Sequence, residues 1–191
     1  MNNKKLNTPL DESVELLEAG DKVEITGEII TGRDRVHAFL AESKKELPFS
    51  LKGSIIYHVG PIVQKEFSEW KITAAGPTTS IREEIYEDRV IEMYGIKAVM
   101  GKGGMGERTK NALIKNNAVY LHAIGGAAAL LGKHVEKVLG VYKLEEFGSP
   151  EAMWKLQVKD FPAIVTMDSK GNSIHEKIEQ ESYKKLQELI K

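Results

Sequence analysis

The chain of 191 residues contains no cysteine. This excludes disulfide bonds, a thiol nucleophile and an iron–sulfur cluster ligated by the chain's own thiolates. The sequence also has no apolar run that approaches the roughly 20 residues of a membrane-spanning helix. No apolar segment follows the N-terminal M-N-N-K-K-L-N, so we expect no secretory signal. A soluble protein of the cytoplasm is therefore expected.

The chain also lacks an excess of charge of either sign. Its 27 Lys and Arg residues against 28 Asp and Glu residues give a net charge of −1. No broad basic surface is implied, and nucleic acid is not an expected partner. The length suits one well-buried domain, and there is no repeat or linker. We therefore expect a single domain over residues 1–191, with an extended arm at 1–10 and a C-terminal helix at 176–191.

Short apolar segments alternate with amphipathic ones along most of the chain. We expect strands at residues 23–30, 54–59, 70–73, 96–100, 118–123 and 135–142, a closing pair of strands at 156–159 and 163–167, and helices at 11–19, 34–40, 63–70, 81–94, 107–115, 127–131 and 176–190. The tail helix should lay an apolar stripe on the core. This alternation predicts an α/β sheet layered with helices. Turns that follow the strands should meet along one rim of that sheet, where such folds bind ligands.

The most informative stretch is A-A-G-P-T-T-S-I-R at residues 74–82, between an expected strand and an expected helix. The first turn of a helix offers free N–H groups and a positive dipole end to an anion. Thr78, Thr79 and Ser80 add hydroxyls, and Arg82 adds a planar guanidinium that fits a carboxylate or a phosphate. One hydroxyl would suffice to cap the helix. Three hydroxyls beside an arginine favour an anion site over simple capping.

Three cations follow expected strands in glycine-containing turns: Arg33, Arg82 and Lys102. A lone arginine is most often a surface charge. Three cations in similar positions, in a chain of balanced charge, instead indicate a site for a small polyanion. Two guanidinium forks and an ammonium would suit the two ends of a dicarboxylate, or a phosphate.

Other patterns do not predict a site. The glycine-rich segment 101–106 lacks the spacing of known nucleotide-binding loops, and a turn that needs positive φ explains it better. The histidines show no metal-ligand spacing, and we interpret them as structural, although His58 and His122 could approach the rim. Glu83 and Glu84 are interpreted as favourable charges in the first turn of a helix.

Three motifs occur in the order T-G-R-D at 31–34, G-P-T-T-S-x-R at 76–82 and G-K-G-G-M at 101–105. With them the chain resembles the beta subunits of two-subunit class I fumarate hydratases, in the iron–sulfur hydro-lyase family that also includes L-tartrate dehydratase. The resemblance implies a swivelling β/β/α domain, with a mixed sheet and helices packed on its faces. It also implies a separate alpha subunit that holds a [4Fe–4S] cluster, which agrees with the absence of cysteine here.

The resemblance assigns the role of catalytic base to Thr78. The further residues that it places around the substrate are Arg33, Gly76, Thr79, Ser80, Arg82 and Lys102. In this assignment the two arginines bind substrate carboxylates, the lysine adds an electrostatic contact, and the remaining residues shape the backbone. No metal ligand is assigned to this chain. A threonine hydroxyl is a weak base unaided, and the hypothesis is that a carboxylate of the alpha subunit activates it.

The leading hypothesis is a subunit that hydrates fumarate reversibly to (S)-malate and acts only with its cluster-bearing alpha partner. The close alternative is the beta subunit of L-tartrate dehydratase, which would use the same anchors. The alternative from another class is a non-catalytic anion-binding module. Cationic loops gathered at one rim repel each other unless an anion or an acidic partner completes them. A heterodimer with the alpha subunit is therefore expected.

Overall fold

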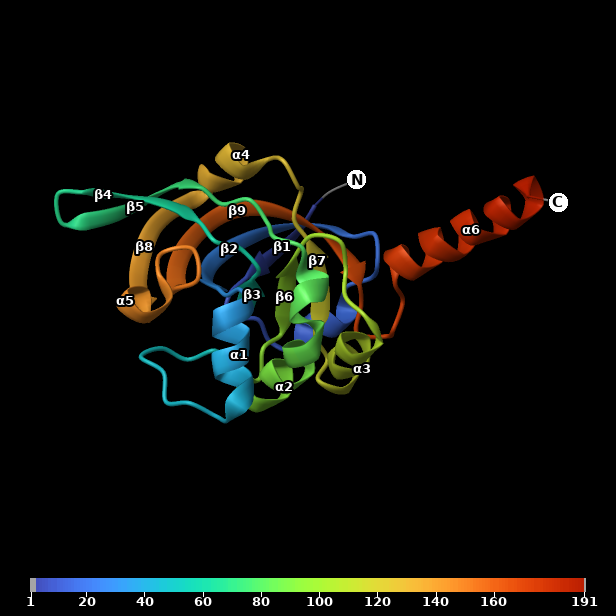
Figure 1. The fold of residues 1–191 in the computed structure, drawn as a ribbon, viewed down its shortest axis with the longest axis horizontal. Helices are drawn as coiled ribbons and strands as arrows, with labels where there is room; N and C mark the ends of the chain where they lie inside the picture. The colour runs from blue at the N-terminus through green and yellow to red at the C-terminus, as the bar shows by residue number, and fades with distance from the viewer. Residues whose placement is uncertain (1–2, 191) are drawn as a thin grey trace.

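A seven-stranded mixed sheet organises the chain, whose structure, a computed structural model, describes residues 3–190 (Figure 1). Its strands are β1 (Lys4–Asn7), β2 (Lys22–Thr31), β3 (Ile55–Tyr57), β6 (Ala98–Gly101), β7 (Val119–His122), β8 (Val135–Tyr142) and β9 (Met153–Met167), and a separate two-stranded sheet consists of β4 (Ile62–Glu66) and β5 (Glu69–Ala74). The helices are η1 (Glu12–Leu16), α1 (Asp34–Glu42), η2 (Ser80–Glu83), α2 (Glu84–Tyr94), α3 (Glu107–Lys115), α4 (Ala128–Gly132), α5 (Leu144–Phe147) and α6 (Ile174–Leu189).

The sheet closes into a ring. Its strand order is β1-β2-β3-β6-β7-β9-β8, and β2 also pairs with β9, so that β2, β3, β6, β7 and β9 surround one interior. The first four of these strands run parallel, and β9 runs antiparallel to its neighbours. The long strands β2 and β9 curve around the ring in Figure 1. The predicted α/β class, with a mixed sheet and helices packed on it, is confirmed.

Two apolar cores lie on opposite sides of the central strands. In β3, Ile55 and Tyr57 face the interior of the ring, whereas Ile56 faces the cluster beneath α1, α2 and α3. The side chains of β6 and β7 alternate in the same way, and the three helices lie together on that side in Figure 1. Strands buried on both faces read as continuous apolar runs, which is why these strands were predictable.

The predicted helical segment at 63–70 is wrong, because these residues form the β4–β5 hairpin. Val63, Phe67 and Trp70 have helical spacing, which explains the incorrect prediction. The chain turns at Phe67, with φ +54°. The hairpin is held by tertiary contacts: the indole of Trp70 packs edge-on against Trp154 at 5.3 Å between ring centroids. The expected strand at 70–73 therefore belongs to this hairpin and not to the main sheet.

The two strands predicted at 156–159 and 163–167 are one continuous strand, β9, which runs through Pro162. Strand β8 pairs with β9 as far as Val158, and β7 pairs with it only from Ile164 onward. Between these two points β9 has a strand neighbour on one side only. A proline, which has no N–H to donate, is tolerated at such an edge position.

The C-terminal helix was predicted correctly, but its expected contact with the core is wrong. Helix α6 extends away from the body of the molecule in Figure 1, and none of its residues is buried. Amphipathic spacing predicts an apolar face and does not predict what covers it.

Within the described residues no helix is long and apolar enough to cross a membrane. Residues 1–2 of the expected arm and residue 191 of the expected helix lie outside the described residues; within the arm, Lys4–Asn7 form strand β1.

Gly27 allows the bend of β2, and its replacement tests the ring. Its φ is +117°, the pairing with β9 shifts register between Ile25 and Gly27, and a Cβ at this position would collide with Thr8. We expect Gly27→Ala to lower the free energy of unfolding by about 1–3 kcal/mol, measured by denaturant unfolding. Gly140→Ala in β8 is the matched control, because its Cβ would meet no atom within 4 Å. Equal stability of the two variants would contradict this role of Gly27.

Candidate active site

The carboxyl ends of the parallel strands meet at one edge of the ring. The register places Thr31 of β2 beside Tyr57 of β3, and Tyr57 beside Met100 of β6. Arg33 and Lys102 follow β2 and β6 within two residues, so both leave the sheet at this edge. The predicted meeting of these turns at one rim is thus present in the structure.

The segment 75–80 lies across the ends of β3 and β6. The Thr78 N–H donates to the carbonyl of His58 at 2.7 Å. Thr79 forms a parallel bridge with Lys102, in which the Lys102 N–H donates to the Thr78 carbonyl at 3.2 Å and the Ser80 N–H donates to the Lys102 carbonyl at 2.9 Å. These bonds fix Thr78 beside the Lys102 turn, although β5 itself is not part of the main sheet.

Close packing explains the glycine of the G-P-T-T-S motif. A Cβ on Gly76 would lie 2.7 Å from the Cβ of Ala128 in α4. The contact with α4 therefore requires a glycine here, and the predicted contribution of Gly76 to the backbone around a substrate stays a prediction.

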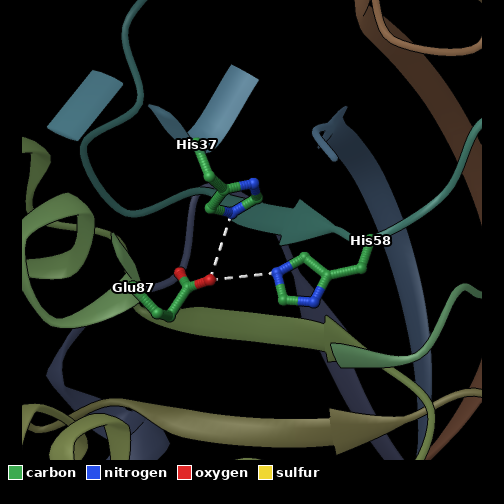
Figure 2. A group of neighbouring side chains, drawn as sticks. All are labelled: His37, His58 and Glu87. Carbon is green, nitrogen blue, oxygen red and sulfur yellow. Dashed lines mark hydrogen bonds and ion pairs between the residues drawn. The ribbon is translucent and has the colours of Figure 1, made fainter. Parts of the chain in front are cut away.

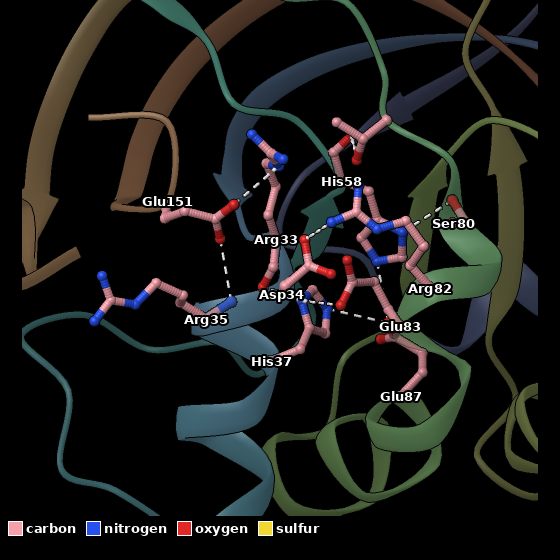
Figure 3. Close-up of polar contacts among 11 residues, drawn as sticks. Arg33, Asp34, Arg35, His37, His58, Ser80, Arg82, Glu83, Glu87 and Glu151 are labelled. Carbon is pink, nitrogen blue, oxygen red and sulfur yellow. Dashed lines mark hydrogen bonds and ion pairs between the residues drawn. The ribbon is translucent and has the colours of Figure 1, made fainter. Parts of the chain in front are cut away.

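Two of the three predicted cations are paired with carboxylates of the same chain (Figure 3). Nε of Arg33 lies 3.3 Å from Oε1 of Glu151, and the guanidinium of Arg82 forms a short ion pair with Asp34. Burial alone would raise the pKa of Asp34, but the Arg82 guanidinium outweighs it and lowers this pKa. Among residues 3–190 the ammonium of Lys102 forms no ion pair. Both arginines keep further N–H groups for an incoming anion.

The three hydroxyls of the motif have different surroundings. Thr78 is half-buried and its Oγ1 donates to the His58 carbonyl at 3.1 Å, whereas Thr79 is exposed. Thr79 precedes η2 without a side-chain capping bond, so capping does not explain it. Ser80 is buried and points inward, where its Oγ lies 2.9 Å from Nδ1 of His58 and accepts a bond from the Tyr120 hydroxyl at 2.8 Å. Of the three, only Thr78 and Thr79 are placed to reach a ligand at the rim.

A buried group of ionisable side chains lies directly beneath this rim, and sequence reasoning missed it (Figure 2). Oε2 of Glu87 lies 3.1 Å from Nε2 of His37 and 3.0 Å from Nε2 of His58. Oε2 of Glu83 lies 3.8 Å from Nδ1 of His37. We call His37, His58 and Glu87 the His–Glu–His cluster. Glu83 and Glu87 are one helical turn apart on a buried face, and that spacing is the signal that could have drawn attention to them.

The cluster holds its charges as an ion pair. Burial lowers the pKa of His37, but the carboxylates of Glu87 and Glu83 outweigh it and raise this pKa to about 9. Burial raises the pKa of Glu87, but the two imidazoles lower it to about 2. Burial lowers the pKa of His58, and burial also raises the pKa of Glu83, to about 7. At neutral pH the cluster is therefore an imidazolium, a carboxylate and a neutral imidazole.

Glu84 ties the glycine-rich turn to α2 and does more than supply a first-turn charge. Its carboxylate accepts bonds from the N–H groups of Gly106 and Arg108 at 2.8 and 2.9 Å and from the Thr109 hydroxyl at 2.7 Å. Gly103 and Gly104 have φ of +85° and +76°. The interpretation of this segment as a turn that needs positive φ is confirmed.

Comparison with known proteins identifies the family of the chain. A sequence model of the family described as "Fumarase C-terminus" matches residues 2–178. The chain belongs to this family. All three motifs at 31–34, 76–82 and 101–105 lie within the matched region, so the resemblance stated from them is confirmed.

Relatives of the fumarase C-terminal family carry two kinds of name. The chain is 52% identical over 186 residues to a protein of Geobacillus stearothermophilus whose name includes "fumarate hydratase class I". The matched region covers 96% of this chain but 36% of that protein. It is 45% identical over 183 residues to a Methanocaldococcus jannaschii protein named as an L(+)-tartrate dehydratase subunit beta, with 94% of each chain covered. The L(+)-tartrate dehydratase subunit beta of Escherichia coli is 40% identical over 173 residues, with 90% and 86% covered. The chain thus spans about a third of the first relative and most of the other two.

Proposed function

We propose that this chain is the beta subunit of a hydro-lyase that adds water reversibly to fumarate to give (S)-malate, at a site completed by an alpha partner. One observation carries the proposal: Arg33, Lys102 and the hydroxyl of Thr78 are brought to one edge of the ring, and Arg82 is joined to the same turn through Asp34. This set of cations around a hydroxyl suits a small dicarboxylate whose neighbouring carbon exchanges a proton. Membership of the fumarase C-terminal family supports the reaction class.

The anchoring step follows from the donors that remain available. The Nε side of the Arg33 guanidinium lies at ion-pair distance from Glu151, and its terminal NH1 and NH2 groups remain for a substrate carboxylate. Gly60 makes room for this side chain, because a Cβ there would lie 2.7 Å from NH1 of Arg33. Arg82, held by Asp34, is placed to bind the second carboxylate, and Lys102 adds a point charge. The substrate would thus be held at both ends.

In the dehydration direction Thr78 would remove the proton from C3 of malate. Its hydroxyl donates to the His58 carbonyl, so the lone pairs of Oγ1 are directed away from that bond. Within residues 3–190 no carboxylate is bonded to this hydroxyl. The neighbour that activates it is therefore proposed to be a carboxylate of the alpha subunit.

The residues of this rim do not fit an iron–sulfur cluster. The side chains at the rim end in guanidinium, ammonium and hydroxyl groups, and the chain has no cysteine to ligate iron. We therefore propose that the alpha partner holds a [4Fe–4S] cluster, which would act as the Lewis acid toward the substrate hydroxyl. This chain's own part is to bind the carboxylates and to move the C3 proton.

L-Tartrate is the second candidate substrate. The observation in its favour is that the relatives matched over most of their own length are named as tartrate dehydratase beta subunits. Tartrate is also a C4 dicarboxylate, so both carboxylate anchors would serve it unchanged.

The proposed function predicts activity only in a mixture of the two subunits. Hydration and dehydration should be measured anaerobically for this chain alone, for a reconstituted cluster-bearing alpha subunit alone, and for the two together, on fumarate and on L-tartrate. Turnover in the mixture alone is expected, with fumarate preferred. A silent mixture whose cluster is verified intact, together with dicarboxylate binding by this chain alone in calorimetry, would instead support a non-catalytic anion-binding module.

A further inference from the structure

The His–Glu–His cluster is connected at both ends to the backbone that carries the predicted anchors (Figures 2 and 3). At one end, Nδ1 of His37 lies 3.0 Å from the carbonyl oxygen of Arg33. At the other end, the carbonyl of His58 accepts bonds from both the N–H and the hydroxyl of Thr78. Glu87 joins the two imidazoles through a single oxygen. One carboxylate thus links the turn of the first arginine to the turn of the threonine.

The partners around the cluster determine where its protons lie. Both nitrogens of His37 face oxygens that can only accept, the Arg33 carbonyl and the Glu87 carboxylate, so both nitrogens carry a proton. Ser80 accepts from the Tyr120 hydroxyl, and its own proton is then directed to Nδ1 of His58. His58 in turn donates from Nε2 to Glu87. These roles are mutually consistent when His37 is an imidazolium and Glu87 is a carboxylate.

Burial makes this arrangement sensitive to the loss of any member. His37, His58 and Glu87 are all fully buried, and the two imidazole rings meet edge-on at 4.8 Å between centroids. A buried carboxylate without a cation is strongly destabilised, so the surrounding backbone moves if the pair is broken. Two backbone groups would feel such a movement: the carbonyl of Arg33, which bonds to His37, and the carbonyl of His58, which holds Thr78. Sub-ångström placement of such groups matters, since a misplacement of about 1 Å costs about a hundredfold in rate.

We infer that His37, Glu87 and His58 are positioning residues, which hold the Arg33 turn and the Thr78 turn in the relative arrangement that the reaction needs. This inference rests on the proposed function. His37 acts on the carboxylate anchor, His58 acts on the proton-transferring hydroxyl, and Glu87 couples the two. None of the three touches the substrate.

The two ends of the cluster should affect different kinetic parameters in the assembled complex. We expect His37→Asn to raise KM about tenfold or more with a smaller change in kcat, because Arg33 is displaced, and His58→Asn to lower kcat by up to about a hundredfold. Glu87→Gln should change both. His134→Asn is the matched control, because Nδ1 of His134 also bonds a backbone carbonyl, that of Lys159 at 3.0 Å, but this contact is exposed, lies beside the start of β8 and belongs neither to the cluster nor to the three rim turns.

A variant without the buried ion pair separates the loss of positioning from a loss of the fold. The double variant H37N/E87Q removes both members of the ion pair, and the buried carboxyl of Glu83, whose pKa is already raised to about 7, should take up a proton once the imidazolium is gone. It should fold, as judged by circular dichroism, and still show the altered KM and kcat. If the wild-type complex turns over, and if His37→Asn and His58→Asn have the same kinetics as His134→Asn, the inference is overturned while the proposed function stands. Absence of wild-type turnover would overturn the proposed function, and this inference with it.

The protonation of His37 gives a readout that does not depend on activity. The groups that face it are Glu87 from α2, Glu83 from η2 and His58 from the end of β3, with Asp34 and Arg82 beyond Glu83. In ¹⁵N-histidine NMR of the whole chain we expect both ring nitrogens protonated at neutral pH, with the proton lost as the pH rises through about 9. In Glu87→Gln this loss should move to lower pH. A neutral His37 at pH 7, or a stoichiometric metal ion in the purified chain in place of the proton, would overturn the inference.

The same proton makes the stability of the chain depend on pH with a definite sign. The pKa of His37 is about 9 in the folded chain, against an ordinary value of 6.5. The folded chain therefore binds more protons than the unfolded chain between these values. Its contribution to the free energy of unfolding is complete below about pH 6.5 and is lost as the pH rises through about 9. We expect denaturant unfolding to show this decline in the wild type and a weaker one in H37N/E87Q.

Discussion

Replacement of Thr78 by alanine is expected to reduce the turnover of the assembled complex by about a hundred- to ten-thousandfold, the loss that follows from removal of a positioned acid–base group. KM should change little, because the carboxylate anchors remain. The fold should survive: the carbonyl of His58, which accepts the Thr78 hydroxyl, keeps its bond from the Thr78 N–H. The measurement is steady-state kinetics of fumarate hydration in the mixture of subunits, with subunit association checked by gel filtration.

Thr73→Ala is the matched control for this prediction. The hydroxyl of Thr73 also donates to a backbone carbonyl, that of Ile62 at 3.2 Å, but it lies in the β4–β5 hairpin and is exposed. Its removal should leave kcat and KM unchanged. A wild-type rate in Thr78→Ala would remove Thr78 from the mechanism.

Arg82→Lys is expected to lower kcat/KM about ten- to a hundredfold, because hydrogen bonds to a charged group contribute about 1.5–3 kcal/mol each. Asp34 already occupies one edge of the guanidinium. An ammonium held by Asp34 would have no second planar edge to offer a substrate carboxylate. Steady-state kinetics on fumarate and on L-tartrate in the mixture of subunits would measure the loss for each acid.

The control for the arginine is Arg89→Lys on the exposed surface of α2, which should leave kcat/KM unchanged. Loss of activity in both variants to the same extent would indicate a general effect of arginine replacement. An unchanged kcat/KM in Arg82→Lys would exclude Arg82 as a carboxylate anchor.

The rim of the site was largely predictable from sequence, because its cations directly follow buried strands. Arg33 and Lys102 sit immediately after apolar runs whose parallel pairing brings their ends together. The segment 76–82 was predicted to join them as the end of a central strand. It reaches the rim by a different route, through the bonds of Thr78 and Ser80 to His58 and Lys102 after a hairpin outside the main sheet.

The errors have a common physical origin. The helical spacing of Val63, Phe67 and Trp70 is local, whereas the packing of Trp70 on Trp154 joins residues far apart in the chain. Likewise, a proline usually interrupts a strand. At Pro162 the strand continues because β9 has no strand neighbour on one side there. Long-range contacts overrode the local signal in both cases.

The sequence by itself determined the alternation of buried strands and helices, the family, and the cations and hydroxyl of the rim, because apolar periodicity and short motifs are local properties of a chain. Only the tertiary structure decided the closure of the sheet through β2 and β9, the exposure of α6 and the burial of the His–Glu–His cluster. His37, His58 and Glu87 come from separate elements and have no characteristic spacing. Burial alone would neutralise His37 and Glu87, and they keep their charges because folding places the imidazole and the carboxylate within ion-pair distance.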